Sequence, residues 1–328
     1  MDALCDYQLD NLSDLDLTHS LSSDADTNAE LILTLGHCHT LKVLDLSLNN
    51  LHVPGGRALG KVISQLSLQI LNVSNANLGD EGMAALAKSL HGTCYIGMLH
   101  LENNDIHVTG VTVLADKQNL IIETDLCLDG NPLCLDGVKA LIRMLSSEHF
   151  QTPFLDLRGC SLTIVGGSVI PTVSTSPNIS EPITCVGIRE WIYSNGIKAN
   201  NVVLLNLSGN SFTGNGIHLL AGFVYLCPQL KVLNCDGCEI NSDDLKQLLL
   251  LFSRLNLNLE DWRLWDNNID DDGVSALIER VSIFPSLMNI NICYNNHISS
   301  GILLKLQEIC DRRKEVNSII PLFKIFYH

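Results

Sequence analysis

The feature that most constrains the fold is a leucine pattern that recurs about every 28 residues. One clear copy contains Leu41, Leu44, Leu46 and Asn49, which occupy positions 1, 4, 6 and 9 of the pattern. The first positions of ten copies fall at residues 12, 41, 68, 96, 123, 152, 202, 230, 259 and 287. The spacing is nearly constant, except for one longer interval between positions 152 and 202. Such a period predicts a stacked array of small units rather than one globular core.

Each copy divides into a strand half and a helix half. Alternating leucines predict a short strand with one buried face. The second half, as in residues 82–90 and 272–280, has apolar residues at helical spacing. One unit cannot bury its own apolar face, so stacking should place parallel strands inside a curved solenoid and helices outside. The asparagine at position 9 should satisfy backbone groups where the chain leaves the strand, and cysteine replaces it in some copies.

These residues resemble the leucine-rich repeats, and the copy length is similar to that of their ribonuclease-inhibitor-like subclass. The resemblance covers roughly residues 10–314. It implies an α/β solenoid of about ten repeats of roughly 27–29 residues, a curved horseshoe with strands on its concave face and helices on its convex face. The last copy, residues 285–299, also resembles the end of the Tonsoku-like replication-repair scaffolds, whose ankyrin and tetratricopeptide parts are absent here.

Three parts are expected along the chain. Residues 1–40 form an acidic N-terminal cap with a degenerate first repeat, residues 41–314 hold the repeats, and residues 315–328 form an apolar tail. The tail either covers the last repeat or docks on a further domain or partner. Three prolines in the longer interval predict an inserted loop near 166–186, which is either a plain connection or a regulatory or partner-binding segment. The helical pattern resumes over residues 188–192.

Composition excludes several classes of protein. Hydrophobic residues make up 46% of the chain, which excludes a disordered chain. The net charge of −16 argues against direct binding of nucleic acid or an anionic membrane. No secretory signal and no transmembrane run is visible in the sequence. We therefore expect a cytoplasmic protein, with a nuclear one as the alternative, and cysteines that are free thiols.

Candidate metal and catalytic motifs do not survive comparison with the repeat pattern. Cys235 and Cys238 resemble half of a zinc site, but they occupy a buried leucine position and the asparagine position. Cys38, between two histidines, lies three residues before its copy and should pack against the core. Cys127 and Cys293 occupy exposed strand positions, and nothing in the sequence pairs them. No nucleophile elbow, zinc-protease or phosphate-binding motif is present, so we expect no metal, no cofactor and no enzyme activity.

The concave face should carry the function, because residues between the leucines point out of it. Positions 2, 3, 5, 7 and 8 of the copies contain eleven acidic residues and only four basic ones. The acids are Asp14, Asp16, Asp45, Glu102, Asp125, Asp129, Asp156, Asp236, Glu260, Asp261 and Asp266. This excess predicts either a surface for a basic partner segment or a merely solvated face.

A sharper feature lies in the copy that begins at residue 259. Trp262 takes a core leucine position, whereas Trp265 falls on the concave side, and Tyr294 lies one repeat further on. Arg263 is close to them in sequence, with Asp236, Asp261 and Asp266. Tryptophan, tyrosine and arginine dominate binding hot spots, so this group is predicted either to bind a partner or to pack under the tail.

The sequence thus predicts a non-enzymatic scaffold that binds an unidentified protein, with a basic segment as one possibility, on its strand face. The resemblance implies the same, because ribonuclease-inhibitor-like repeats serve mostly as protein-binding surfaces. One alternative is a regulator of a small GTPase, since Ran GTPase-activating proteins have similar repeats. The other is the repeat module of a larger receptor or replication-repair scaffold.

Overall fold

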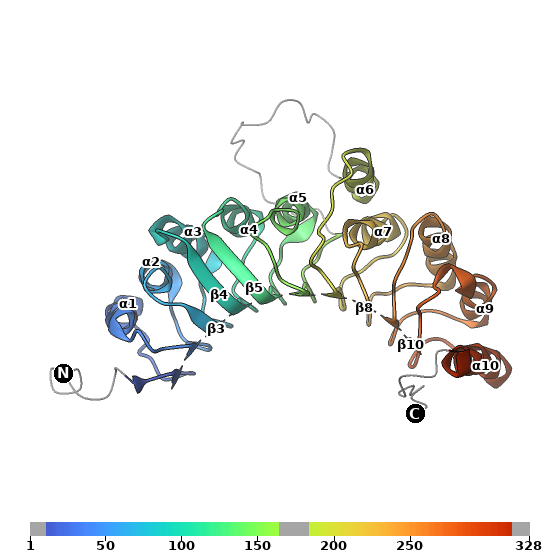
Figure 1. Ribbon diagram of the computed structural model, residues 1–328, viewed down its shortest axis with the longest axis horizontal. Coiled ribbons are helices and arrows are strands. Elements are labelled where there is room, and N and C mark those ends of the chain that lie inside the picture. The colour runs from blue at the N-terminus through green and yellow to red at the C-terminus, as the bar shows by residue number, and fades with distance from the viewer. Residues whose placement is uncertain (1–10, 164–183, 317–328) are drawn as a thin grey trace. The chain divides into compact units, whose positions relative to one another are not determined.

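The computed structural model describes residues 11–163 and 184–316, which are drawn in colour in Figure 1. These residues fall into two compact units. Of the described residues, the first unit comprises 11–133 and 137–160, and the second comprises 134–136, 161–163 and 184–316. Within each unit, every described strand except the last is followed by a helix, after which the chain returns to the next parallel strand. The fold is therefore an α/β leucine-rich-repeat solenoid, as the repeat pattern predicts.

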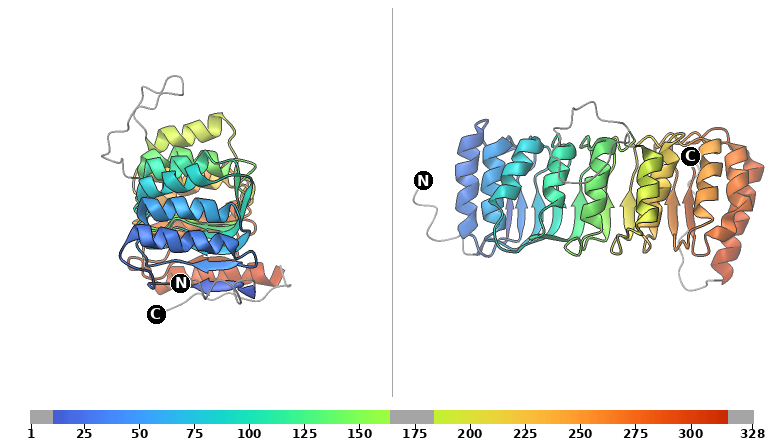
Figure 2. Two further views of the ribbon diagram at one scale, coloured as in Figure 1. Left: turned by 90° about the vertical axis from the view of Figure 1, so that its left-hand side faces the viewer. Right: turned by 90° about the horizontal axis from the view of Figure 1, so that it is seen from above.

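The first unit contains six described strands that pair in parallel in chain order. Its strands are β1 (Asp14–Asp16), β2 (Val43–Asp45), β3 (Leu68–Asn72), β4 (Cys94–His100), β5 (Leu120–Cys127) and β6 (Phe154–Asp156). Its helices are α1 (Ala25–Thr34), the 3-10 helix η2 (Leu35–His37), α2 (His52–Ile63), α3 (Gly79–Ser89), α4 (Val108–Ala115) and α5 (Cys134–Leu145), of which the first three residues are grouped with the second unit. These helices lie side by side along one face of the strands (Figure 2).

The second unit has the same plan, with four described strands paired in parallel in chain order. Its strands are β7 (Leu204–Asn206), β8 (Val232–Asn234), β9 (Asp261–Arg263) and β10 (Asn289–Asn291). Its helices are α6 (Cys185–Ser194), α7 (Gly216–Leu226), α8 (Ser242–Phe252), α9 (Asp271–Glu279), the 3-10 helix η3 (Val281–Ile283) and α10 (Ser300–Val316). Each of these strands has three residues, and its central residue is buried in the core.

The core of each unit consists of the repeated apolar positions between strands and helices. Leu41, Leu44 and Leu46 are all fully buried, as are their counterparts Leu205 and Leu207 in the second unit. Burial of one leucine side chain contributes roughly 1.5–3 kcal/mol. The periodic leucines therefore determine which side of every strand faces the helices.

Asparagine at position 9 connects neighbouring repeats. The Asn104 side chain donates hydrogen bonds to the carbonyls of Val73 (2.8 Å) and Leu101 (3.0 Å) and accepts from the amides of Ala76 and Leu78. Where cysteine replaces asparagine, the thiol still donates: Cys238 Sγ lies 3.3 Å from the Leu207 carbonyl. The structure confirms the role that the repeat pattern predicts for this position.

Position 8 of every copy has a left-handed backbone, with φ between 50° and 67°. Its occupants are His19, Leu48, Asn75, Asn103, Gly130, Gly159, Gly209, Gly237, Asp266 and Tyr294. Glycine, asparagine and aspartate tolerate this conformation, whereas bulky side chains adopt it at a cost. Seven of the ten copies hold one of the tolerant residues, so the histidine, the leucine and the tyrosine are exceptions.

The remaining predictions about the organisation of the chain have mixed outcomes. The helix expected over residues 188–192 is α6, which begins at Cys185. The loop expected near 166–186 and the tail expected over 315–328 lie almost wholly outside the described residues. The boundaries of the three parts and the capping role of residues 1–40 stay predictions. Within the described residues, no helix has both the length and the apolar character that crossing a bilayer requires.

Candidate partner-binding face

The strand face of each unit is defined here as the exposed side chains at positions 3, 5, 7 and 8 of its repeats. Six of the ten residues predicted to bind a partner lie in the second unit, and four lie in the first. The six are Asp236, Asp261, Arg263, Trp265, Asp266 and Tyr294, and the four are Asp45, Glu102, Asp129 and Asp156.

The second unit brings the two predicted aromatic residues into contact. The ring centroids of Trp265 and Tyr294 are 5.2 Å apart, and their planes are inclined by 57°. Trp265 is 38% exposed and Tyr294 is 63% exposed, whereas Trp262 is fully buried between Phe252 and Phe284. The structure confirms that Trp262 belongs to the core and that Trp265 lies on the strand face.

The backbone around this pair is held by one acidic side chain and by a backbone hydrogen bond to the next repeat. Asp236 Oδ1 accepts a hydrogen bond of 2.7 Å from the Trp265 amide. The Asp266 amide donates to the Cys293 carbonyl (3.0 Å), and Asp266 occupies the left-handed position of its repeat. Asp236 thereby links the strand ends of two neighbouring repeats and determines where the indole lies.

Two carboxylates of the same strand face, Asp236 and Asp261, are held partly out of water. Burial raises the pKa of Asp236, although the Trp265 amide and Arg263 lower it in part. Burial also raises the pKa of Asp261, against the lowering effect of Arg263, whose Nε lies 3.3 Å from Asp261 Oδ2. The strand face that carries the aromatic pair therefore also holds acidic groups that a cation could further stabilise in their charged form.

In the first unit, the predicted acids already have partners on the strand face. Asp45 accepts hydrogen bonds from the Ser47 amide and from the Asn72 side chain (both 2.8 Å). Arg158 lies 2.9 Å from Asp156 and 3.9 Å from Asp129.

Position 5 has a structural role that the leucine pattern does not predict. Its aspartates and asparagines accept a hydrogen bond from the backbone amide two residues later, which closes the turn after the strand. This contact is present at Asp16, Asp45, Asn72, Asp156, Asn206, Asn234 and Asn291. Some of the acidic residues on the strand face are therefore explained by the turns that they close. Their number alone does not indicate a basic partner.

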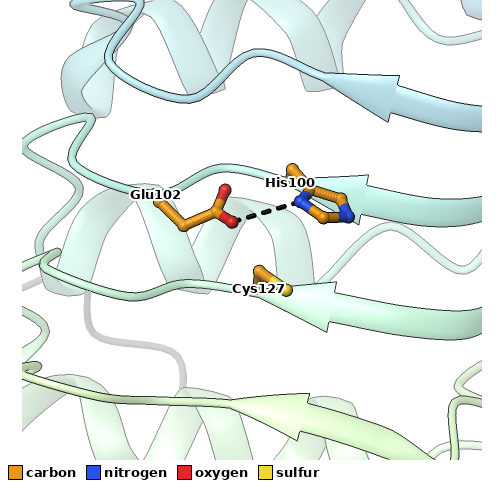
Figure 3. A group of neighbouring side chains, drawn as sticks. All are labelled: His100, Glu102 and Cys127. Atoms are coloured by element: carbon orange, nitrogen blue, oxygen red, sulfur yellow. Dashed lines mark hydrogen bonds and ion pairs between the residues drawn. The ribbon is translucent and has the colours of Figure 1, made fainter. Parts of the chain in front are cut away.

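A second cluster on the strand face of the first unit was missed (Figure 3). The side chains of His100, Glu102 and Cys127 lie together, with one donor atom from each within 4.8 Å of the others. The His100 ring Nδ1 is 3.1 Å from Glu102 Oε1. The signal in the sequence was His-x-Glu at positions 5 and 7 of one copy, followed by cysteine at position 5 of the next.

The hydrogen bond between His100 and Glu102 changes the pKa of both groups. It raises the pKa of His100, although burial opposes the rise. Burial alone would raise the pKa of Glu102, but hydrogen bonds from His100 and Ser74 bring it below its usual value. Burial and the charges of Glu102, Asp156 and Asp125 raise the pKa of the Cys127 thiol to about 12. The cluster thus combines an imidazole, a carboxylate and a neutral thiol.

The cysteines that resembled metal ligands in the sequence lie in the core. Cys235 and Cys238 are fully buried, and burial raises the pKa of Cys235 well above its usual value. Cys38 is also fully buried. These observations agree with the packing roles that the repeat pattern predicts.

Comparison with known proteins finds similarity to leucine-rich-repeat proteins. The sequence profile described as Leucine Rich repeat matches residues 37–60, 65–87 and 255–277. Mouse ribonuclease inhibitor is 26% identical over 253 residues, which is 73% of this chain and 49% of that protein. Human NACHT, LRR and PYD domains-containing protein 14 is 27% identical over 227 residues, which is 66% of this chain but 18% of that protein. The chain thus matches half or less of the length of these relatives.

A solved structure supports the fold alone. The leucine-rich repeat-containing protein LegL7 from Legionella pneumophila has a TM-score of 0.51 at 19% sequence identity. The match covers 92% of this chain and 91% of that one.

Proposed function

Because this chain is a leucine-rich-repeat protein of the ribonuclease-inhibitor-like kind, we propose that it is a non-enzymatic protein-binding module. Its partner binds the strand face of the second unit through Trp265 and Tyr294. A basic segment of the partner interacts with Asp236 and Asp261, while Arg263 and Asp266 border the contact. The acids of the first unit, Asp45, Glu102, Asp129 and Asp156, are secondary sites for the same kind of charge.

The contact between Trp265 and Tyr294 on an exposed face carries this proposal. Aromatic side chains provide a large, rigid contact area and are over-represented where interface energy concentrates. Tyr294 occupies a left-handed position (φ 57°) at which seven of the ten copies have glycine, asparagine or aspartate. A bulky residue in that conformation costs roughly 1–2 kcal/mol. A side chain kept at such a cost on an exposed surface points to a role outside folding.

The charges nearby favour a cationic contact. Bringing a lysine or arginine against Asp236 and Asp261 would favour their ionised form, which burial disfavours in the protein alone. Such charge complementarity speeds association and discriminates between partners more than it adds affinity. Binding should therefore weaken as the salt concentration rises.

The relatives support a protein partner in general terms. The name of ribonuclease inhibitor states that this relative inhibits another protein, and the human relative is a much longer protein that contains a repeat part. We therefore propose that the present chain can act as the repeat module of a larger protein. Regulation of a small GTPase stays a prediction, and stimulated GTP hydrolysis would be its test.

The test is a crosslinking pull-down with Trp265→Ala/Tyr294→Ala beside the wild type. A matched control, Leu250→Ala/Leu304→Ala, removes two exposed apolar side chains from helices α8 and α10 of the same unit. Circular dichroism establishes first that all three proteins are folded. We expect a partner that is crosslinked to the strand face of the wild type and the control and is lost from the aromatic variant. Capture of the same proteins by all three would overturn the proposal.

A further inference from the structure

We propose that His100, Glu102 and Cys127 form a binding site for one zinc ion on the strand face of the first unit (Figure 3). A nitrogen, an oxygen and a sulfur donor are the three ligand types that proteins present to Zn²⁺. All three donor atoms lie within 4.8 Å of one another. Ligands at about 2.0–2.3 Å from a shared tetrahedral ion are about 3.3–3.8 Å apart, so small rotations of the side chains suffice.

The parallel pairing of β4 and β5 brings these side chains together. His100 and Cys127 are register partners on adjacent strands. Glu102 follows His100 by two residues, so all three side chains point to the same face. Ligands on paired strands are held more precisely than ligands on loops.

The two strands differ from the other described strands of the first unit. They are the longest, with seven and eight residues, and their register shifts between Ile96 and Met98. An irregularity of this kind changes the direction of the side chains that follow it. Gly97 lies at the shift, and a Cβ atom there would approach the Gln69 carbonyl oxygen to 2.5 Å. The local backbone thus needs glycine to bring the following strand ends into this register.

Hydrogen bonds around the cluster hold the carboxylate ready for a cation. The Ser74 hydroxyl donates to Glu102 Oε2 (2.5 Å), so Oε1 remains on the side of His100 and Cys127. Asp156 is the register partner of Cys127 on the next strand, and Asp125 lies two residues before Cys127. These acids oppose loss of the thiol proton and attract a positive ion by the same electrostatic field.

Zinc binding replaces water ligands of the ion with side chains and releases a proton from the protein. The Cys127 thiol releases its proton to solvent when sulfur binds Zn²⁺, and His100 binds as the neutral imidazole. The hydrogen bond between His100 and Glu102 is replaced by two bonds to the metal. Each of the three side chains is partly exposed, so the fourth position faces solvent. Water, or a donor group from a bound protein, completes the tetrahedron.

Other metals fit this donor set less well than zinc does. The hard ions Mg²⁺ and Ca²⁺ prefer oxygen ligands, whereas thiolate and imidazole favour zinc. Within the described parts of the chain, this is the one group of three potential ligand side chains at metal-binding separation. The site is independent of the aromatic pair in the second unit, so either proposal can fail alone.

The test uses cobalt as a spectroscopic probe for zinc. The purified protein, freed of metal with a chelator, is titrated with CoCl₂ and then with ZnCl₂. We expect one equivalent of cobalt to produce a sulfur-to-cobalt charge-transfer band and tetrahedral d–d bands, and zinc to displace it. Cys127→Ser should abolish the charge-transfer band. His100→Gln and Glu102→Gln should each weaken binding by at least about tenfold.

Cys134→Ser is the matched control, because Cys134 is a partly exposed cysteine of the same repeat that lies outside the three-residue cluster. Its cobalt spectrum should equal that of the wild type. A charge-transfer band that survives Cys127→Ser, or no stoichiometric binding to the wild type, would overturn the proposal. If a variant does not fold, alkylation of the cysteines of the wild-type protein tests the zinc site instead. One equivalent of zinc should protect Cys127 and leave Cys134 reactive, and equal reactivity with and without zinc would exclude the site.

Discussion

The Trp265 ring lies 5.2 Å from that of Tyr294, while Trp262, three residues before Trp265, is fully buried against Phe252 and Phe284. One repeat thus holds two tryptophans with opposite surroundings. Trp262 fills a position that leucine occupies in most copies, and Trp265 follows the strand end on the exposed face. The two residues should therefore respond differently to the same substitution.

We expect Trp262→Ala to lower the free energy of unfolding by about 3–5 kcal/mol, because it leaves a large cavity in the core. Trp265→Ala should change it by less than about 1 kcal/mol, since the lost contact is partly exposed. Denaturant midpoints of the two variants and the wild type provide the comparison. Similar losses for both would show that the Trp265 ring is part of the core.

The left-handed position 8 gives a second prediction. Leu48 has φ 58° and is 52% exposed, so its side chain gains little from packing. Leu48→Asn should raise the free energy of unfolding by about 1 kcal/mol through relief of backbone strain. Tyr294→Asn should gain less, because it also removes an aromatic contact of about 0.5–1.5 kcal/mol.

Thermal melts of both variants measure these differences, and the reverse exchange Asn103→Leu at another position 8 should destabilise the protein. If Leu48→Asn lowers the melting temperature, then the left-handed backbone at position 8 does not disfavour leucine relative to asparagine.

Much of the fold could be predicted from the sequence because its signal is periodic. The spacing of Leu41, Leu44 and Leu46 determines a strand and its buried side, and ten copies make the spacing unmistakable. The same register explained why Cys235 and Cys238 lie in the core. A periodic pattern also shows which residues are unusual at their position. Trp265 is such a residue, because it is a large aromatic side chain at a position that points away from the core.

Contacts between repeats were harder to predict. His100 and Cys127 belong to successive copies and become neighbours only through the register of two strands. The repeat pattern predicts a first position at residue 123, whereas the structure pairs Ile96 with Ile122 and accommodates the difference by a register shift. The leucine pattern specifies apolar positions alone, so it does not predict the backbone conformation at position 8, although glycine and asparagine recur there.

The asparagine ladder gives a third prediction. The Asn104 side chain forms hydrogen bonds with five backbone groups of two neighbouring repeats and is 1% exposed. Asn104→Ala should lower the free energy of unfolding by at least about 3 kcal/mol, because each unsatisfied buried group costs about 1–3 kcal/mol. Urea denaturation followed by circular dichroism measures the loss.

Asn268→Ala is the control, since this exposed side chain makes one long hydrogen bond, 3.5 Å from Nδ2 to the Glu239 carbonyl. Its effect should stay within about 0.5 kcal/mol. Equal effects at Asn104 and Asn268 would mean that water replaces the inner hydrogen bonds at little cost.

The last prediction concerns Asp236 and Asp261, whose pKa values burial raises above the ordinary 3.8. In the pH range between the unfolded and the folded pKa, the folded protein binds more protons than the unfolded chain. Its stability therefore falls as the pH rises through that range, and both carboxylates oppose folding at neutral pH. Asp236→Asn removes this charge and can keep the hydrogen bond from the Trp265 amide, because an amide oxygen also accepts.

We expect Asp236→Asn to raise the denaturant midpoint at neutral pH and to make it less dependent on pH, while the difference from the wild type vanishes below the ordinary pKa of 3.8. The same substitution should weaken capture of a cationic partner, because it removes a charge beside the aromatic pair. A variant that is less stable than the wild type at neutral pH would show that the charged form strengthens the hydrogen bond to Trp265 by more than burial costs. A gain in stability together with weaker binding would identify Asp236 as a residue kept for its partner rather than for the fold.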